Sequence, residues 1–154
     1  MLVLFSKDNF GIKINVISNL AGAHFDKEVK SMISNLTNAQ FAVMTYLFDH
    51  KDEVITQNQL AAVMHSSHPT MRNVIKRMLD KDLINTKQSE DDKRKVEVQL
   101  SDNGLSIMND KSSSIEKMLV DNQSFLTNGL SKTEVQDLNR MLDKVISNLK
   151  GSDY

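Results

Sequence analysis

The chain has 154 residues, which is the size of one domain and enough to bury a hydrophobic core without metal or disulfide support. Hydrophobic residues make up 40% and charged residues 25%, the balance of an ordinary soluble globular protein. The absence of cysteine excludes disulfides, thiolate metal sites and thiol redox sensing, and it fits the cytoplasm, where we expect the protein to act. The apolar run at residues 1–5 is too short for a signal peptide or a membrane span, so no membrane partner is expected.

The net charge of −1 does not by itself point to a polyanionic partner, but the charges are unevenly distributed. Residues 68–95 contain eight basic and five acidic side chains, so this window is positive within a chain that is negative elsewhere. Such a window indicates where an anion would dock. The alternative is a solvated surface of mixed charge, which is what most charge runs are.

Long helices are expected because the chain has only one proline and five glycines. Three helix starts are predicted by capping boxes, in which Gln or Glu follows a hydroxyl residue by three positions. Two more are predicted by a serine followed by a proline or an acid within the first turn. These five starts are Thr37, Thr56, Ser131, Ser67 and Ser101.

Apolar spacing predicts six helices, each with one stripe facing a core. The last stripe has two apolar residues in each heptad, at alternating spacings of three and four, which is typical of a helix packed on another helix. In chain order the stripes are Ile14, Ile17, Ala21, Phe25 and Met32; Phe41, Met44, Leu47 and Phe48; Leu60, Ala61 and Met64; Met71, Val74, Ile75, Met78 and Leu79; Leu105, Met108, Ile115 and Leu119; and Val135, Leu138, Leu142, Val145 and Leu149.

The periodicity changes to two between the fourth and fifth helices. Val96, Val98 and Leu100 alternate with polar residues, which predicts a half-buried strand, and residues 84–88 can pair with it. The polar tip at 89–95 joins the two. A short helix, a tight turn, a proline-started helix and a charged hairpin follow one another in the order of a winged helix-turn-helix.

The fourth helix has the composition of a recognition helix. Its face opposite the apolar stripe offers groups that donate to base edges and phosphates: Arg matches guanine, Asn matches adenine, and Thr, Lys and a helix N-terminus suit phosphate oxygens. The alternative is an amphipathic helix whose polar face meets only water. The candidate DNA-binding residues here are Ser67, His68, Pro69, Thr70, Arg72, Asn73, Lys76 and Arg77.

The tip of the hairpin adds a second candidate contact with DNA. A basic turn beside a recognition helix can reach the minor groove, where a narrow groove attracts arginine. Arg94 is the candidate for this role, with Lys93 and Lys95 beside it, and Asp92 can pair with Arg94 and hold its shape. The alternative is that Asp92 and Arg94 form a surface ion pair of little value.

Four stretches resemble the multiple-antibiotic-resistance regulator (MarR) family, in the right order along the chain. Residues 92–104 resemble its wing pattern, D-x-R, an alternating strand, then L-[TS]-x-x-G. Residues 36–41 resemble its L-T-x-x-Q entry to the second helix. Residues 57–61 and 69–79 resemble its helix-turn-helix, in a form similar to repressors of multidrug efflux genes.

This resemblance implies a mainly α-helical fold with a small β-hairpin wing, one unit spanning 1–154. The winged helix-turn-helix would occupy 37–100, with the helix-turn-helix at about 57–80 and the wing at about 84–100. A helical dimerisation region would comprise 10–36 and 101–150. The protein would be a homodimer that reads a pseudo-palindromic operator in double-stranded DNA, since two-fold symmetry requires two half-sites.

The chain departs from the family pattern at two points. The family often has Lys-Gly where this chain has Lys81-Asp82, so the turn after the recognition helix must place Asp in the left-handed region. The family's frequent arginine in the middle of the recognition helix is Asn73 here, with Arg72 beside it, so base preference is expected to differ.

MarR-like proteins commonly release DNA when a small molecule binds between the dimer helices and the winged domain. The resemblance therefore implies a repressor released by a small apolar or phenolic effector. Nine methionines and six phenylalanines suit such a ligand, although core packing explains them as well. The contact residues of the effector are not predicted.

Other functions fit the sequence less well. Zinc sensing needs clustered ligands, and the four histidines are dispersed. No phosphate loop, nucleophile elbow or H-E-x-x-H motif is present, so neither enzymatic activity nor a cofactor is expected. The remaining alternative is a winged helix that binds protein and not DNA.

Overall fold

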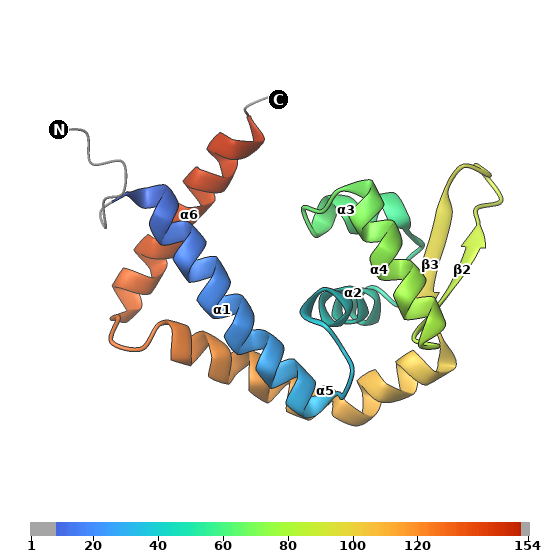
Figure 1. Ribbon diagram of the computed structural model, residues 1–154, viewed down its shortest axis with the longest axis horizontal. Coiled ribbons are helices and arrows are strands. Elements are labelled where there is room, and N and C mark those ends of the chain that lie inside the picture. The colour runs from blue at the N-terminus through green and yellow to red at the C-terminus, as the bar shows by residue number, and fades with distance from the viewer. Residues whose placement is uncertain (1–8, 152–154) are drawn as a thin grey trace. The chain divides into compact units, whose positions relative to one another are not determined.

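The computed structural model describes residues 9–151, so the apolar run at 1–5 lies outside the described part (Figure 1). The helices are α1 (Phe10–Met32), α2 (Asn38–Asp49), α3 (Gln57–Val63), α4 (His68–Asp80), α5 (Asp102–Leu126) and α6 (Lys132–Lys150). The strands are β1 (Ile55–Thr56), β2 (Ile84–Gln88) and β3 (Val96–Leu100). The chain forms two compact units, with the boundary inside α5 between Glu116 and Lys117. The mainly helical fold with a small β-sheet confirms the predicted fold class.

All five predicted helix starts are confirmed. Thr37, Thr56 and Ser131 form complete capping boxes, each with its hydroxyl accepting from the third backbone N–H and the Gln or Glu side chain reaching back. Ser67 caps α4 by accepting from Thr70 N, with Pro69 in the first turn. The Ser101 hydroxyl accepts from Gly104 N at 2.9 Å at the start of α5.

The sheet has three antiparallel strands in the order β1-β3-β2, and not the two that the sequence predicted. The predicted hairpin is present, with Ile84 opposite Leu100 and Gln88 opposite Val96. The additional strand, β1, pairs Ile55 with Val98. A strand of two residues is too short to show alternation, and β1 leads directly into the capping box of α3.

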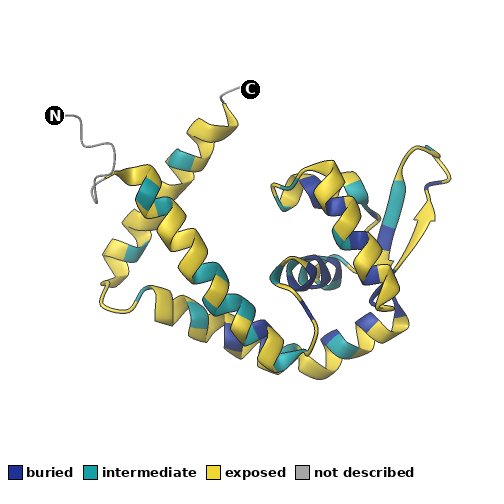
Figure 2. Ribbon diagram, in the orientation of Figure 1, coloured by how far each residue is buried: buried dark blue, intermediate teal, exposed yellow. Residues whose placement is uncertain are grey.

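The core of the first unit lies between α2, α3, α4 and the inner face of the sheet (Figure 2). Met71, Ile75 and Met78 of α4 are buried, as the predicted stripe requires. On α1, Ile17 of the predicted stripe is 63% exposed in the single chain, whereas Val29, which the stripe omitted, is fully buried. The second unit contains the end of α5 and all of α6. No described residue of α6 is buried, so its predicted apolar seam is not covered by the rest of the described chain.

A short turn follows each of the two helices of the helix-turn-helix. After α3, His65 has φ 47°, His65 N donates to Ala62 O, and Ser66 N donates to Ala61 O. After α4, Asp82 has φ 53°, Asp82 N donates to Leu79 O, and Leu83 N donates to Met78 O. Both are Schellman turns with a left-handed residue where glycine is usual. The expected left-handed Asp82 is thereby confirmed.

The turn after α4 is held against the start of α5. The carbonyl of Asp82 accepts from Ser101 Oγ at 2.7 Å and from Asn103 Nδ2 at 3.1 Å. Leu83 O accepts from Ser101 N at 3.1 Å. A Cβ on Gly104 would lie 2.1 Å from Leu83 O, so only glycine fits where these two backbone segments meet.

Lys81 links the same end of α4 to the segment between α1 and α2 through hydrogen bonds. Its Nζ donates to Asn35 O and, at 2.9 Å, to Oε1 of Gln40, which is 2% exposed. Gln40 Oε1 also accepts from Thr37 N in the capping box of α2. A buried amide oxygen is therefore satisfied by donors from two different elements.

Replacing Gly104 with Ala is expected to lower the free energy of unfolding by about 2 kcal/mol or more, because the backbone at Leu83 must move. Chemical denaturation measures this change. Gly22→Ala is the matched control: the new Cβ meets no atom within 4 Å in α1. That control should gain about 0.5–1 kcal/mol from helix propensity. Equal effects of the two substitutions would contradict the close approach.

Candidate nucleic-acid interface

The solvent-facing side of α4 brings the predicted contact residues together. Three buried residues of the opposite side, Met71, Ile75 and Met78, fix the rotation of the helix. All eight candidates between Ser67 and Arg77 are exposed, as the sequence analysis expected. Within residues 9–151, the side chains of Arg72, Asn73, Lys76 and Arg77 have no hydrogen bond or ion pair.

The N-terminus of α4 presents groups that suit an anion. Ser67 Oγ lies 2.7 Å from Thr70 Oγ1 and accepts from Thr70 N at 3.2 Å, so one hydroxyl caps the helix while a second lies beside it. His68 and Pro69 form the exposed first turn. Because Pro69 has no N–H, and Thr70 N and Met71 N are bonded to Ser67, His68 N is the backbone N–H of this turn that stays open within the described chain, where the helix dipole favours negative charge.

The wing is the hairpin of β2 and β3 in the first unit; β2 contacts α4, and the tip projects beyond the sheet (Figure 1). Ser89 N donates to Lys95 O at 3.0 Å and closes the end of the ladder. Beyond this bond, Lys95 N donates to Asp92 O at 2.8 Å, so residues 92–95 form a β-turn with Lys93 and Arg94 at its centre.

Asp92 organises the tip, as the sequence analysis expected. Its Oδ1 accepts from Arg94 N at 3.0 Å and from Arg94 Nε at 3.1 Å. The Arg94 side chain is nevertheless 91% exposed, so the contact orients the guanidinium without covering it. Hydrogen bonding by the Arg94 side chain, helped by its backbone N–H, lowers the pKa of Asp92.

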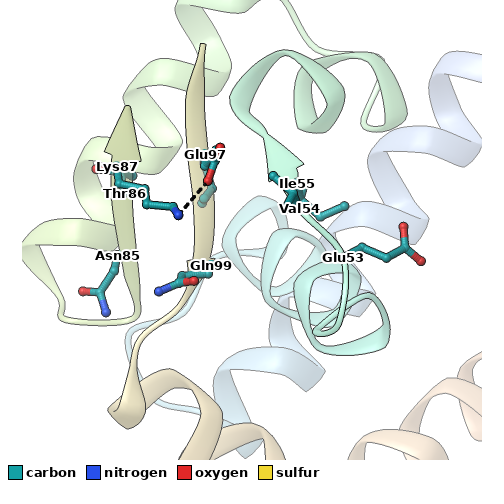
Figure 3. Close-up of a pocket in the computed structure, with 9 residues that line it drawn as sticks. Glu53, Val54, Ile55, Asn85, Thr86, Lys87, Glu97 and Gln99 are labelled. Atoms are coloured by element: carbon teal, nitrogen blue, oxygen red, sulfur yellow. Dashed lines mark ion pairs between the residues drawn. The ribbon is translucent and has the colours of Figure 1, made fainter. Parts of the chain in front are cut away.

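A second carboxylate lies near the tip end of the β2–β3 ladder, on the outer face of the sheet (Figure 3). Glu97 of β3 lies opposite Lys87 of β2, and its Oε2 is 3.2 Å from Lys87 Nζ. The side chain of Glu97 is 14% exposed, and Ser89 is 9% exposed. The sequence analysis missed this cluster, because the pairing of Lys87 with Glu97 depends on the length of the turn between them.

The hollow around this ion pair is small. It has a volume of about 130 Å³ and is lined by residues of β1, β2, β3 and the segment before β1. Asn85 and Gln99 lie side by side on β2 and β3, while the Glu53 side chain points away from the ion pair (Figure 3). A hollow of this size suits water and not an organic ligand.

A larger open groove lies between the first half of α2, the turn after α3 and the first half of α4. Ala39, Ala42, Met64, Met71 and Val74 supply apolar surface, while Asn38, His65, Ser66, Ser67 and Thr70 supply polar groups. None of these lining residues is Asp, Glu, Lys or Arg. Ser67 and Thr70 therefore belong both to this groove and to the N-terminus of α4.

Two further findings concern metals and membranes. Among residues 9–151, no group of three His, Asp or Glu side chains is arranged to hold a metal ion. None of the described helices combines the length and hydrophobicity needed to cross a bilayer.

The sequence matches known proteins over the same region that forms the interface. A model of the MarR family matches residues 36–96, from just before α2 to the start of β3. The HTH-type transcriptional regulator MgrA of Staphylococcus aureus is 33% identical over 112 residues, which are 73% of this chain and 71% of that protein. The chain belongs to the MarR family.

Solved structures share the fold of this MarR family protein. MepR of S. aureus in its DNA complex has a TM-score of 0.79 at 22% identity, covering 92% of this chain and 99% of MepR. BpsR of Bordetella bronchiseptica, whose DNA binding is regulated by 6-hydroxynicotinic acid, has a TM-score of 0.76 at 21% identity, covering 97% of this chain and 98% of BpsR. At this identity the likeness establishes the fold.

The pKa of Asp92 tests the geometry of the tip directly. The pKa of Asp92 is lowered in the folded protein. The Asp92–Arg94 contact therefore stabilises the wing fully at pH values above the pKa of an ordinary carboxyl group, and this stabilisation is lost as the pH falls through the lowered pKa. In Arg94→Ala, we expect the pKa of Asp92 to rise toward the ordinary value of an aspartate carboxyl. A carboxyl-carbon NMR titration measures it, with Lys93→Ala as the control. An unchanged pKa in Arg94→Ala would contradict the contact.

Proposed function

We propose that this MarR family protein is a sequence-specific, DNA-binding transcriptional regulator that binds a pseudo-palindromic operator as a homodimer. The observation that carries the proposal is the exposed side of α4, where Arg72, Asn73, Lys76 and Arg77 lie together without partners in the described chain. A helix about 10–12 Å wide fits the major groove, which is about 12 Å wide. MepR, which shares the fold, is known in complex with DNA.

In this proposal α4 reads bases and the wing reads the neighbouring groove. Arg72 is the candidate for a bidentate contact with guanine, and Asn73 for one with adenine. Ser67, His68, Thr70, Lys76 and Arg77 contact phosphates and set the register of α4 on the duplex, and Pro69 fixes the first turn of the helix. Arg94 enters the minor groove with its guanidinium oriented by Asp92, while Lys93 and Lys95 contact the flanking phosphates.

Two copies are needed to read two half-sites. Exposed apolar residues on α1 and α6 support a dimer: Phe10, Ile17 and Leu20 on α1, and Leu142, Ile146 and Leu149 on α6. An apolar stripe on a helix with no buried residue is expected to be covered by another helix. We therefore assign residues 10–36 and 101–150 to dimerisation and residues 37–100 to DNA binding.

DNA binding is tested by fluorescence anisotropy on duplex from upstream of the protein's own gene, against scrambled duplex, over a salt series. Arg72→Ala is expected to lose about 1–3 kcal/mol of operator binding and to relax base preference at one position. Lys76→Ala should weaken binding to both duplexes. It should also reduce by about one the slope of the logarithm of the binding constant against the logarithm of the salt concentration.

Lys51→Ala, just after α2, removes a charge of the same sign outside α4, the wing and the residues assigned to dimerisation, and should leave operator affinity unchanged. Sedimentation must find all variants in the oligomeric state of the wild type. Absence of binding at low salt, followed by failure of a genomic selection to enrich any fragment, would replace the proposal with the alternative of a protein-binding winged helix.

The groove between α2, the turn after α3 and α4 is the candidate effector site. Its apolar walls and uncharged polar rim suit a neutral or weakly polar aromatic molecule such as a phenol. BpsR responds to a hydroxylated aromatic acid. Because Ser67 and Thr70 line the groove, a bound molecule would contact the N-terminus of α4 and compete with DNA there. Release by such a molecule would make the protein a repressor.

Ala42→Phe tests the effector site by filling the groove from α2. A panel of phenolic compounds is titrated against the complex of protein and operator, and at least one compound is expected to lower operator affinity by about tenfold, a coupling of about 1.4 kcal/mol. In Ala42→Phe that response should be lost while the affinity without the compound is retained. An effector that acts equally on both proteins would contradict this site.

A further inference from the structure

The outer face of the wing contains a carboxylate that no sequence motif explains. Glu97 is 14% exposed although it lies on the solvent side of the sheet, and Lys87 and Ser89 lie against it from β2 and the start of the tip. The inner face is the one that packs on the core, through Ile84 and Val98. Glu97 is therefore covered by the wing's own polar side chains.

We propose that Glu97 is a positioning residue for DNA binding, which fixes the turn from which Arg94 projects by holding Lys87 and Ser89 together where the strands of the wing meet the tip. The proposal rests on the proposed function, because it assigns a role to Arg94 on DNA. Glu97 itself does not contact DNA in this proposal, since a carboxylate is repelled by phosphate.

The path from Glu97 to Arg94 is short and consists of hydrogen bonds. Hydrogen bonding by the Ser89 side chain is the largest cause of the lowered pKa of the Glu97 carboxyl. Ser89 N donates to Lys95 O at 3.0 Å, and Lys95 N donates to Asp92 O at 2.8 Å. Asp92 Oδ1 then holds Arg94 through its backbone N–H and its Nε. Two carboxylates thus act in series, Glu97 at the end of the strands and Asp92 in the tip.

The burial of Ser89 supports this assignment. It is 9% exposed, whereas its neighbour Glu90 and the next residue, Asp91, are exposed. A serine buried at the start of an otherwise solvated tip anchors the tip to the sheet. The lowered pKa of Glu97, caused first by Ser89 and then by Lys87, indicates that the carboxylate is charged when it holds them.

Electrostatics alone makes the opposite prediction from positioning. Glu97→Gln removes a negative charge from a DNA-binding wing and releases Lys87, both of which should strengthen binding to phosphate. Positioning predicts weaker binding, by about fivefold, the loss expected for one net hydrogen bond. Asp91→Asn is the matched control, since within the described chain its side chain has no hydrogen bond or ion pair. That control should bind operator as tightly as the wild type, or more tightly.

A double-mutant cycle separates positioning from a general loss of structure. If Glu97 acts through Arg94, the Glu97→Gln/Arg94→Ala protein should bind operator within about twofold of Arg94→Ala alone. Additive losses would overturn the proposal, as would tighter binding by Glu97→Gln. If the thermal midpoint shows that Glu97→Gln folds poorly, Ser89→Ala takes its place in the same double-mutant cycle.

Amide hydrogen exchange in the free protein makes the test independent of DNA. Glu97→Gln should accelerate exchange of the Ser89 and Lys95 amides at least tenfold over Asp91→Asn, with exchange in α4 unchanged. Unchanged exchange at these two amides would overturn the positioning of the tip. If the wild type binds no DNA while exchange at the tip accelerates as expected, the proposed function fails and the role of Glu97 in the wing stands.

Discussion

Where α4 ends and β2 begins, the backbone of Leu83 lies so close to Gly104 that no Cβ can be placed between them. Asp82 takes a left-handed conformation to make this corner, and its carbonyl accepts from Ser101 and Asn103 at the start of α5. The end of the recognition helix, the start of the wing and the start of the long fifth helix are thereby fixed at one point. This contact therefore constrains the direction of α4 relative to the hairpin.

The two parts of the proposed interface are held in different ways. Helix α4 is oriented by burial of Met71, Ile75 and Met78, so its polar face needs no internal partners and remains available. The tip of the wing has no core beneath it and is shaped by carboxylates, Asp92 for Arg94 and Glu97 for Lys87 and Ser89. The basic surface that we propose contacts phosphate therefore depends on acidic residues for its shape. This explains why the wing contains acidic residues within a positive window.

The sequence predicted the local features well, because they depend on residues close together in the chain. The capping boxes at Thr37 and Thr56 and the pair of Asp92 with Arg94 each lie within three residues. It did not predict the link from Lys81 to Gln40, the burial of Val29 or strand β1, because each depends on how distant segments meet. The Lys87–Glu97 pair has the same origin, since its register is set by the tip. The role of Gly104 was visible only as part of a family pattern, and the approach to Leu83 supplies its physical reason.

The central claim is that α4 and the wing lie together on DNA, and the absence of cysteine allows it to be tested at a single labelled site. Glu90→Cys places a label on the exposed tip of the wing without removing a basic residue. An iron–EDTA group attached there should cut operator DNA in two clusters, one in each half-site and related by the operator's two-fold axis, in the groove next to the one that α4 occupies. Cleavage that is absent, or spread evenly along a duplex to which the labelled protein is bound, would contradict the account.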